Sequence, residues 1–235
     1  MDPLLHSVAV VIMRELYIKP DARYSDLMRP TGLESDVFKF HLRRLIKQGI
    51  VEKLGVGTYA LTAAGKELAN RFDYPAGVAV RQPKMTTITI LRREQGDGHE
   101  YLFHRRSRNP YYGYWGVLGG AVAWGESFEA AAQRGVRLRT GLDVQDLRLS
   151  GYYRQRDFDK RTGVVLEDKL FVVYIADIFT GQLVEETDLG TNRWRTLEDI
   201  MGEAKYFLAC IDMIHRADGP LYSLENDSRY LSEEY

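Results

Sequence analysis

The amino-acid sequence predicts an α+β protein made of two parts, and three observations support this prediction. Apolar residues recur at helical spacing through much of residues 1–72. Residues 85–91 and several later segments are rich in β-branched residues and are bounded by turn residues. Residues 113–142 pass from a strand-like pattern through two glycines to a helix rich in Ala and Arg. We expect a first part at 1–72, a second at 78–217 and a C-terminal tail at 218–235.

Composition narrows the class of protein. An apolar content of 45% is enough for a buried core, and a net charge of −1 gives no reason to expect a strongly charged partner for the chain as a whole. The single cysteine, Cys210, excludes an intramolecular disulfide framework and fits a reducing compartment. The first segment lacks the basic start of a signal peptide, and Arg14 and Glu15 interrupt its apolar run. We expect a cytoplasmic protein with no membrane partner.

The first part begins with a helix at 3–17, whose apolar residues recur at a spacing of three to four. Gly49 ends a later helix, and Thr62 is suited to cap the last one. The other predicted elements, in chain order, are a short helix at 25–28, a turn at 30–32, a helix at 34–48, strands at 50–53 and 58–61, and a helix from 62 to 72.

Helix, helix, turn, helix, hairpin, helix is the order of a winged-helix domain. The segment VFKFHLRRLIKQGIVEKLGVGTYALTAAGKELA resembles winged-helix repressors of the arsenic- and multidrug-resistance-regulator types. The resemblance covers residues 1–72 and implies that the helix at 34–48 enters the major groove of DNA. It also implies a homodimer on an inverted repeat, because two-fold dimers match paired half-sites.

The helix at 34–48 has two different faces. Phe38, Leu42 and Leu45 share one face, which we expect to be core. The predicted DNA-binding residues are Ser35, Lys39, Phe40, Arg43 and Lys47. The first part carries 11 Lys and Arg against 8 Asp and Glu, so it is mildly basic. A solvated basic face, or a winged helix that contacts protein, is the alternative interpretation.

The second part starts after a predicted linker at 73–77. A strand at 85–91 is followed by a hairpin turn at 95–98 and a second strand at 101–104. A basic stretch at 105–108 then leads to a strand that contains Trp115.

The stretch that follows resembles the Nudix box, a loop and helix with the pattern Gly, five residues, Glu, seven residues, Arg-Glu-apolar-x-Glu-Glu-x-Gly-apolar. The positions that match are Gly120, Glu126, Arg134, Val136, Gly141 and Leu142. Ser127 is suited to begin the helix and Gly141 to end it. The resemblance covers about residues 78–217 and implies an α/β/α sandwich with a mixed sheet.

Three glutamates of the box are absent, and their positions hold Gly135, Leu138 and Arg139. In the family these carboxylates hold divalent metal, and hard cations need several oxygen ligands. Arg139 repels a cation but suits a phosphate oxygen. We therefore expect a Nudix fold with no standard metal site and no cofactor, in which Glu126 pairs with Arg134. A relocated site that uses Glu126, Glu129 and a later carboxylate is the alternative.

The rest of the chain continues the family pattern. Segments 147–156 and 166–178 are predicted to form a long hairpin. Segment 192–200 resembles the closing part of the family pattern, a strand that contains Trp194 followed by a helix. An amphipathic helix is expected at 204–216. Residues 219–235 are polar and aromatic, and we expect either a loose tail or a segment that packs on a partner.

Two functions fit these patterns. The first is a transcription regulator that binds DNA and senses a nucleotide-like or sugar-phosphate effector. The second is a Nudix hydrolase of a nucleoside diphosphate derivative that uses magnesium at a rebuilt site. The residues predicted to bind the ligand are Arg105, Arg106, Trp115, Gly119, Gly120 and Arg139.

Overall fold

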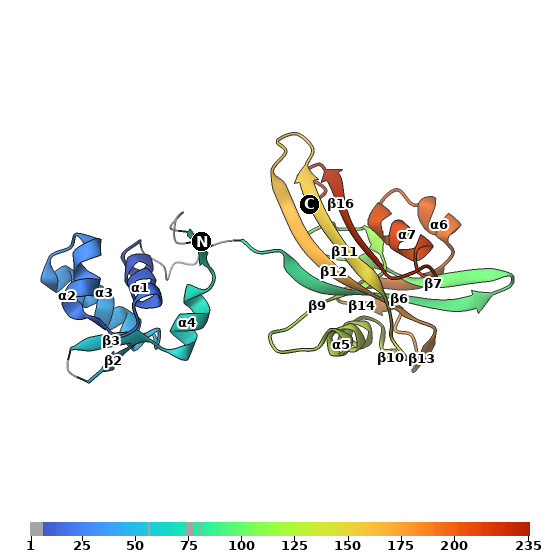
Figure 1. Ribbon diagram of the computed structural model, residues 1–235. Coiled ribbons are helices and arrows are strands. Elements are labelled where there is room, and N and C mark those ends of the chain that lie inside the picture. Colours follow the sequence, from blue (N-terminus) through green and yellow to red (C-terminus); the bar gives the residue numbers. More distant parts are fainter. Residues whose placement is uncertain (1–6, 56, 74–77, 80) are drawn as a thin grey trace. The chain divides into compact units, whose positions relative to one another are not determined.

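The computed structural model describes residues 7–55, 57–73, 78–79 and 81–235 (Figure 1). Its contacts separate the chain into two units, Met1–Arg81 and Gln82–Tyr235, which we describe one at a time. The start of the first predicted helix and most of the predicted linker, at 1–6 and 74–77, lie outside the described residues.

The first unit consists of helices followed by a hairpin and a further helix, in the predicted order. Its strands β1, β3 and β2 form an antiparallel sheet in that order; the short strand β1 was not predicted. The elements are α1 (Ser7–Ile18), β1 (Ala22–Arg23), α2 (Tyr24–Met28), the 3-10 turn η1 (Arg29–Thr31), α3 (Ser35–Lys47), β2 (Val51–Leu54), β3 (Thr58–Leu61), α4 (Ala63–Ala69), β4 (Phe72–Asp73) and β5 (Val78–Ala79). Strand β5 pairs with β4, so Val78–Ala79, which we expected to open the second part, belongs to this unit.

The core of the first unit explains its helix order. Phe38, Leu42 and Leu45 of α3 are buried, as predicted, and they lie in one cluster with residues of α1 and α2. Thr62 caps α4 by accepting a hydrogen bond from the amide of Gly65 at 3.0 Å. A Cβ atom on Gly65 would lie 2.0 Å from the carbonyl oxygen of Ile50, so glycine is needed where α4 approaches the strand.

The second unit contains one large sheet and three helices. Its elements are β6 (Lys84–Gln95), β7 (Gly98–Arg106), β8 (Trp115–Gly116), β9 (Leu118–Ala121), α5 (Phe128–Thr140), β10 (Asp143–Gln145), β11 (Arg148–Asp159), β12 (Val165–Ala176), β13 (Ile178–Thr180), β14 (Glu186–Thr187), β15 (Gly190–Arg195), α6 (Leu197–Met201), α7 (Leu208–His215) and β16 (Tyr222–Tyr230). The main strand order is β14-β15-β7-β6-β12-β11-β16, with β9 on β6 and β8 on β7. The sheet is mixed, as predicted, because β6–β12 and β11–β16 are parallel pairs.

Helices cover both faces of this sheet. Ile88 and Ile90 of β6 share a buried cluster with residues of α7, whereas the next residue, Leu91, lies in a cluster with Val136 of α5. Neighbouring residues of a strand point to opposite faces, so α7 and α5 lie on opposite sides. Figure 1 shows this layered arrangement, which agrees with the predicted sandwich. Each helix of the described chain is too short or too polar to cross a membrane.

Three expectations for the second unit were wrong. Gly119 and Gly120 lie in strand β9 and not in a loop. The last helix, α7, begins at Leu208 and not near residue 204. The segment read as a loose tail forms strand β16, which pairs in parallel with β11. Its sequence, YSLENDSRY, is polar, but every second residue is half-buried, a pattern typical of an edge strand with one covered face.

Candidate functional site

The loop before α5 is held by Glu126 and Arg134, which form the predicted ion pair. The Arg134 guanidinium donates two hydrogen bonds of 2.7 Å to the Glu126 carboxylate and a third, of 2.8 Å, to the carbonyl of Ala121. Glu126 also accepts a hydrogen bond from the amide of Ala123 at 2.9 Å. Helix α5 then begins at Ser127, whose hydroxyl accepts from Ala130, and ends at Gly141 with φ of 74°, both as predicted. The matching box residues therefore shape the loop and the helix.

This ion pair gives a testable pH dependence. Arg134, together with the Ala123 amide, lowers the pKa of Glu126 from its usual value of 4.5 to about 2. A lowered pKa in the folded state stabilises the fold above the unfolded pKa, and this contribution is lost as the pH falls through the folded pKa. Glu126→Gln should therefore lower the melting temperature at pH 7, and its difference from wild type should shrink between pH 4.5 and about 2.

Thermal unfolding across that pH range, followed by circular dichroism, measures this difference. Glu129→Gln is the control, because it removes a carboxylate from the first turn of the same helix. A Glu126→Gln difference that stays constant down to pH 2 would contradict the assignment.

The first altered box position, Gly135, is a packing position. It is buried, and a Cβ atom on it would lie 3.2 Å from the Cα of Gly120. A Cβ on Gly120 would in turn lie 3.0 Å from the carbonyl oxygen of Ala131. The two glycines therefore allow the backbones of α5 and β9 to touch, and a glutamate at 135 would require the helix to shift.

The other two altered positions differ in where they point. Leu138 is 63% exposed, so it is not a core residue. As a leucine, it also has no side-chain atom that could bind a metal. Arg139 lines a cavity and donates a hydrogen bond of 3.2 Å to the carbonyl of Gly135. Of the three positions, only Arg139 places a functional group in the cavity, and that group is a cation.

The cavity has a volume of about 300 Å³. This is within the size range of small-molecule sites. It is lined mainly by strands of the sheet and by α7, and α5 contributes Arg139. Four aromatic side chains contribute to its wall, namely Tyr111, Phe171, Phe207 and Tyr230. The Lys, Arg, His, Asp and Glu residues of its lining are Lys84, His104, Arg106, Arg139, Asp157, Glu167 and Lys169.

The lysines and acids of the cavity are engaged by neighbouring side chains. Lys84 donates to both carboxylate oxygens of Glu167 at 2.9 Å, and Lys169 lies 3.7 Å from the same carboxylate. Asp157 accepts hydrogen bonds from Tyr111 at 2.6 Å and Gln155 at 2.8 Å, while burial raises its pKa. The polar groups at this end of the cavity are therefore already bonded to neighbouring side chains.

The two arginines are different. Within the described part of the chain, neither Arg106 nor Arg139 forms an ion pair with a carboxylate. Arg106 donates instead to the carbonyl of Pro110 at 2.8 Å. Burial, followed by repulsion from Arg108, lowers the pKa of both guanidinium groups. The cavity thus contains two partly buried guanidinium groups that form no ion pair with a carboxylate among the described residues, although Glu167 is near enough to attract Arg106.

The structure brings four of the six predicted ligand residues to this cavity: Arg106, Gly119, Gly120 and Arg139. The other two lie elsewhere. Arg105 is exposed and lines a smaller hollow, which Arg106 also borders, but it does not line the cavity. Trp115 is buried in the core cluster on the α7 side.

The acids and lysines of the cavity were not predicted to line the ligand site. They come from β6, β11 and β12, whose pairing is non-local. The one available signal was the alternation in β12, where Glu167, Lys169 and Phe171 share a face.

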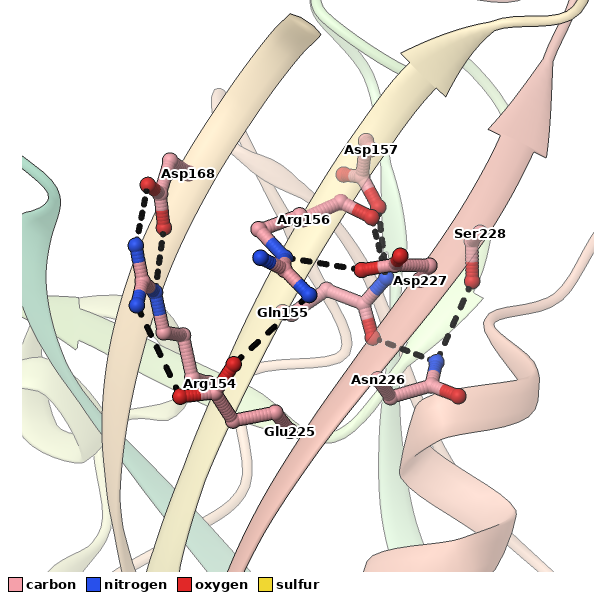
Figure 2. A network of polar contacts seen from close by, with 9 residues as sticks. All are labelled: Arg154, Gln155, Arg156, Asp157, Asp168, Glu225, Asn226, Asp227 and Ser228. Carbon is pink, nitrogen blue, oxygen red and sulfur yellow. Dashed lines mark hydrogen bonds and ion pairs between the residues drawn. The ribbon is translucent and has the colours of Figure 1, made fainter.

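A polar network joins β16 to β11 and β12, the strands that line the cavity. This network lies on the face of the sheet opposite to the cavity. Figure 2 shows Arg154 between Asp168 and Glu225, and Arg156 between Glu225 and Asp227. On the cavity side, Asn226 donates to the side-chain oxygen of Gln155 at 2.9 Å. Tyr235, beyond the strand, donates to Glu167 at 2.8 Å. The C-terminal segment is therefore part of the cavity wall and not a separate tail.

The residues at the box do not fit a divalent cation. The Glu126 oxygens are engaged by Arg134 and Ala123, Gly135 and Leu138 have no ligand atom, and Arg139 is positive. Nor does any group of three His, Cys, Asp or Glu side chains in the described chain converge on a point that could hold a metal ion.

In the first unit, four predicted DNA-binding residues lie on the uncovered face of α3. Lys39, Phe40, Arg43 and Lys47 are exposed. Ser35, also exposed, lies at the start of the helix, where its carbonyl accepts a hydrogen bond of 2.9 Å from the hydroxyl of Tyr24. Tyr24 thereby joins α2 to the first turn of α3.

Comparison with known families places the second unit. A family profile described as NUDIX domain matches residues 83–211, more than half of the chain. The chain belongs to the Nudix family. Curated relatives include the NAD-capped RNA hydrolase NudC of Haemophilus influenzae, 29% identical over 119 residues, and the ADP-ribose pyrophosphatase of Methanocaldococcus jannaschii, 33% identical over 85 residues. These matches cover 49% and 36% of this Nudix chain, but only 40% and 47% of those proteins.

Solved structures agree with the fold. A MutT protein from Bacillus halodurans superposes with a TM-score of 0.51 at 18% identity, over 65% of this chain and 93% of that one. The Nudix domain of Shewanella oneidensis NrtR, solved in complex with ADP ribose, gives a TM-score of 0.49 at 19% identity, over 66% and 96%. At these identities the first similarity shows a shared Nudix fold and nothing about the ligand.

Proposed function

We propose that this Nudix protein is a ligand-responsive transcription regulator. Its first unit is a winged helix that binds DNA through α3, and its Nudix domain binds a phosphate-bearing metabolite. The observation that carries the proposal is the pair Arg106 and Arg139, two cations in the cavity that form no ion pair with a carboxylate in the described part of the chain.

A buried charge without a partner is unfavourable, and an anion in the cavity would compensate it. A phosphate suits two guanidinium groups because each can donate parallel hydrogen bonds to its oxygens. The aromatic part of the wall suits the sugar or base of a nucleotide-like ligand. We therefore propose a nucleotide-like or sugar-phosphate effector, held by Arg139 and Arg106 with no bridging metal.

The DNA-binding part of the proposal rests on the first unit. The short helix α2 and the turn before α3 give the helix-turn-helix order, and β2 and β3 follow as a hairpin in the position of a wing. The uncovered face of α3 carries Lys39, Arg43 and Lys47. We further propose a homodimer, since two copies would match two half-sites.

A hydrolase is the second candidate, and the names of the curated relatives favour it. Both are hydrolytic enzymes acting on compounds with a diphosphate bond. For this chain the activity would require a metal site rebuilt from Glu126 and Glu129 with another carboxylate. Arg134 and Ala123 engage the first of these, so we prefer the regulator.

The two candidates differ in catalysis. We expect no magnesium-dependent hydrolysis of ADP-ribose, dinucleoside polyphosphates or nucleoside triphosphates, since the three box carboxylates are absent. Chromatographic detection of products is the measurement. Turnover above about 1 per second would reject the proposal that the protein is a regulator without hydrolase activity. Loss of that turnover in Glu126→Gln or Glu129→Gln would then locate a rebuilt site.

A thermal-shift series tests ligand binding itself. ADP-ribose, nucleotides and sugar phosphates should be added with and without magnesium, because a ligand that binds the folded state raises the melting temperature. We expect at least one of these compounds to raise it equally in both conditions. A shift that appears only with magnesium would contradict the direct contact with Arg139.

A further inference from the structure

Helix α3 exposes an aromatic residue that folding does not require. Phe40 is 64% exposed, and its ring contacts only its neighbour His41 among the aromatic residues described, with ring centroids 5.5 Å apart. The buried face of the same helix consists of Phe38, Leu42 and Leu45. At 100° per residue, Phe40 lies almost opposite to that face.

Most of the exposed residues around Phe40 are charged. Asp36, Phe40, Arg43 and Lys47 follow one another at spacings of four, three and four, so they form a single stripe along the exposed side of α3. Arg44 lies beside this stripe. The exposed side of α3 therefore carries the Phe40 ring and the apolar side chain of Val37, which is 48% exposed, together with one carboxylate near the start of the helix. Its cations are Lys39, Arg43, Arg44 and Lys47.

The exposed side of α3 therefore favours a partner that is a polyanion and also offers an apolar group to Phe40. A protein partner that covered Phe40 would also bury Arg43, Arg44 and Lys47, and buried charges need partners. A DNA duplex supplies phosphates for the cations at the edges of the major groove. Within that groove each base pair presents donors and acceptors, and thymine alone presents a methyl group.

We propose that Phe40 recognises the 5-methyl group of a thymine in the major groove, so that the operator requires thymine at one position of each half-site. This inference rests on the proposed DNA-binding function. In it, Arg43 and Lys47 contact phosphates and position the helix, whereas Phe40 supplies sequence preference. The hydrogen bond of 2.9 Å from the Tyr24 hydroxyl to the Ser35 carbonyl holds the start of α3, the helix that exposes Phe40.

Replacement of thymine by deoxyuridine tests the proposal, because it removes the methyl group and keeps the base pairing. A duplex obtained by selection from random sequence is first measured with the wild-type full chain by fluorescence anisotropy. Each thymine is then replaced in turn. We expect one replacement per half-site to weaken binding about fourfold, the factor expected for one buried methyl group, and the others to have no effect.

Two variants assign the effect to Phe40. Phe40→Ala should bind the thymine and deoxyuridine duplexes equally, with an unchanged dependence on salt. Phe40→Leu should retain part of the preference. Arg43→Ala is the matched control: it should reduce the salt dependence and keep the preference for thymine. Because Phe40 is exposed, melting temperatures of both Phe40 variants should equal that of wild type.

Three outcomes overturn the inference. Wild type could bind every deoxyuridine duplex as tightly as the thymine duplex. Phe40→Ala could keep the full preference, which would assign the methyl contact to another residue. Phe40→Ala could lose self-association with no change in the response to deoxyuridine, which would place the ring in a protein contact. Failure to select any sequence would instead reject the DNA-binding function.

Discussion

Arg139→Glu should weaken the binding of a phosphate ligand by roughly 100-fold or more. A hydrogen bond to a charged group contributes about 1.5–3 kcal/mol, and the reversed charge adds repulsion to that loss. The fold should remain, because the Arg139 side chain lines the cavity and its hydrogen bond within the described chain goes to the carbonyl of Gly135. The bond from Asn192 is to the Arg139 backbone carbonyl and does not depend on the side chain. Isothermal titration with the compound that gives the largest thermal shift measures the loss.

Arg137→Glu is the matched control. It makes the same charge change on the same helix, but Arg137 is exposed and pairs with Asp143 at 3.2 Å outside the cavity. It should leave ligand affinity within about twofold, because exposed ion pairs contribute little. Magnesium should not restore binding to Arg139→Glu, since Gly135 and Leu138 still offer no ligand. Wild-type affinity in Arg139→Glu would show that the ligand lies elsewhere.

The second large effect concerns DNA. Lys39→Ala combined with Arg43→Ala should weaken binding roughly tenfold to a hundredfold at 0.1 M salt. It should also reduce the slope of log K against log salt by about 1.8, because each phosphate contact contributes about 0.9. Both side chains are exposed, so the stability of the unit should change little. Anisotropy titrations at several salt concentrations give both quantities.

Arg14→Ala combined with Lys66→Ala controls for net charge. These two residues are also exposed, but they belong to helices α1 and α4 and not to the predicted recognition helix α3. The control should leave the slope nearly unchanged. Equal slopes for wild type and the α3 double variant would remove α3 from the DNA interface.

Local patterns in the sequence predicted local structure well. The Glu126–Arg134 pair, the Ser127 cap and the stop at Gly141 all follow from short spacings within one loop and helix. The buried face of α3 followed from helical periodicity in the same way. These features depend on residues close in the chain, which a single sequence displays directly.

Non-local pairing was harder to predict. Arg105 and Arg106 are neighbours in the sequence and both border the smaller hollow, yet only Arg106 also lines the cavity. Glu167 meets Lys84 because β12 and β6 pair in parallel, a register that depends on the whole sheet. Strand β16 was missed because its polar residues gain their partners only through β11 and the network in Figure 2.

The central claim is that the Nudix domain senses a ligand and changes DNA binding by the first unit. Coupling of two binding events is reciprocal, so the ligand must change DNA affinity by the same factor as DNA changes ligand affinity. The decisive measurement is an anisotropy titration of a selected duplex with and without a saturating ligand, paired with calorimetric titration of the ligand with and without DNA. The account predicts equal factors of roughly 5-fold or more, the lower end of typical allosteric coupling, and their disappearance in Arg139→Glu. A factor of one for every ligand that binds would contradict it.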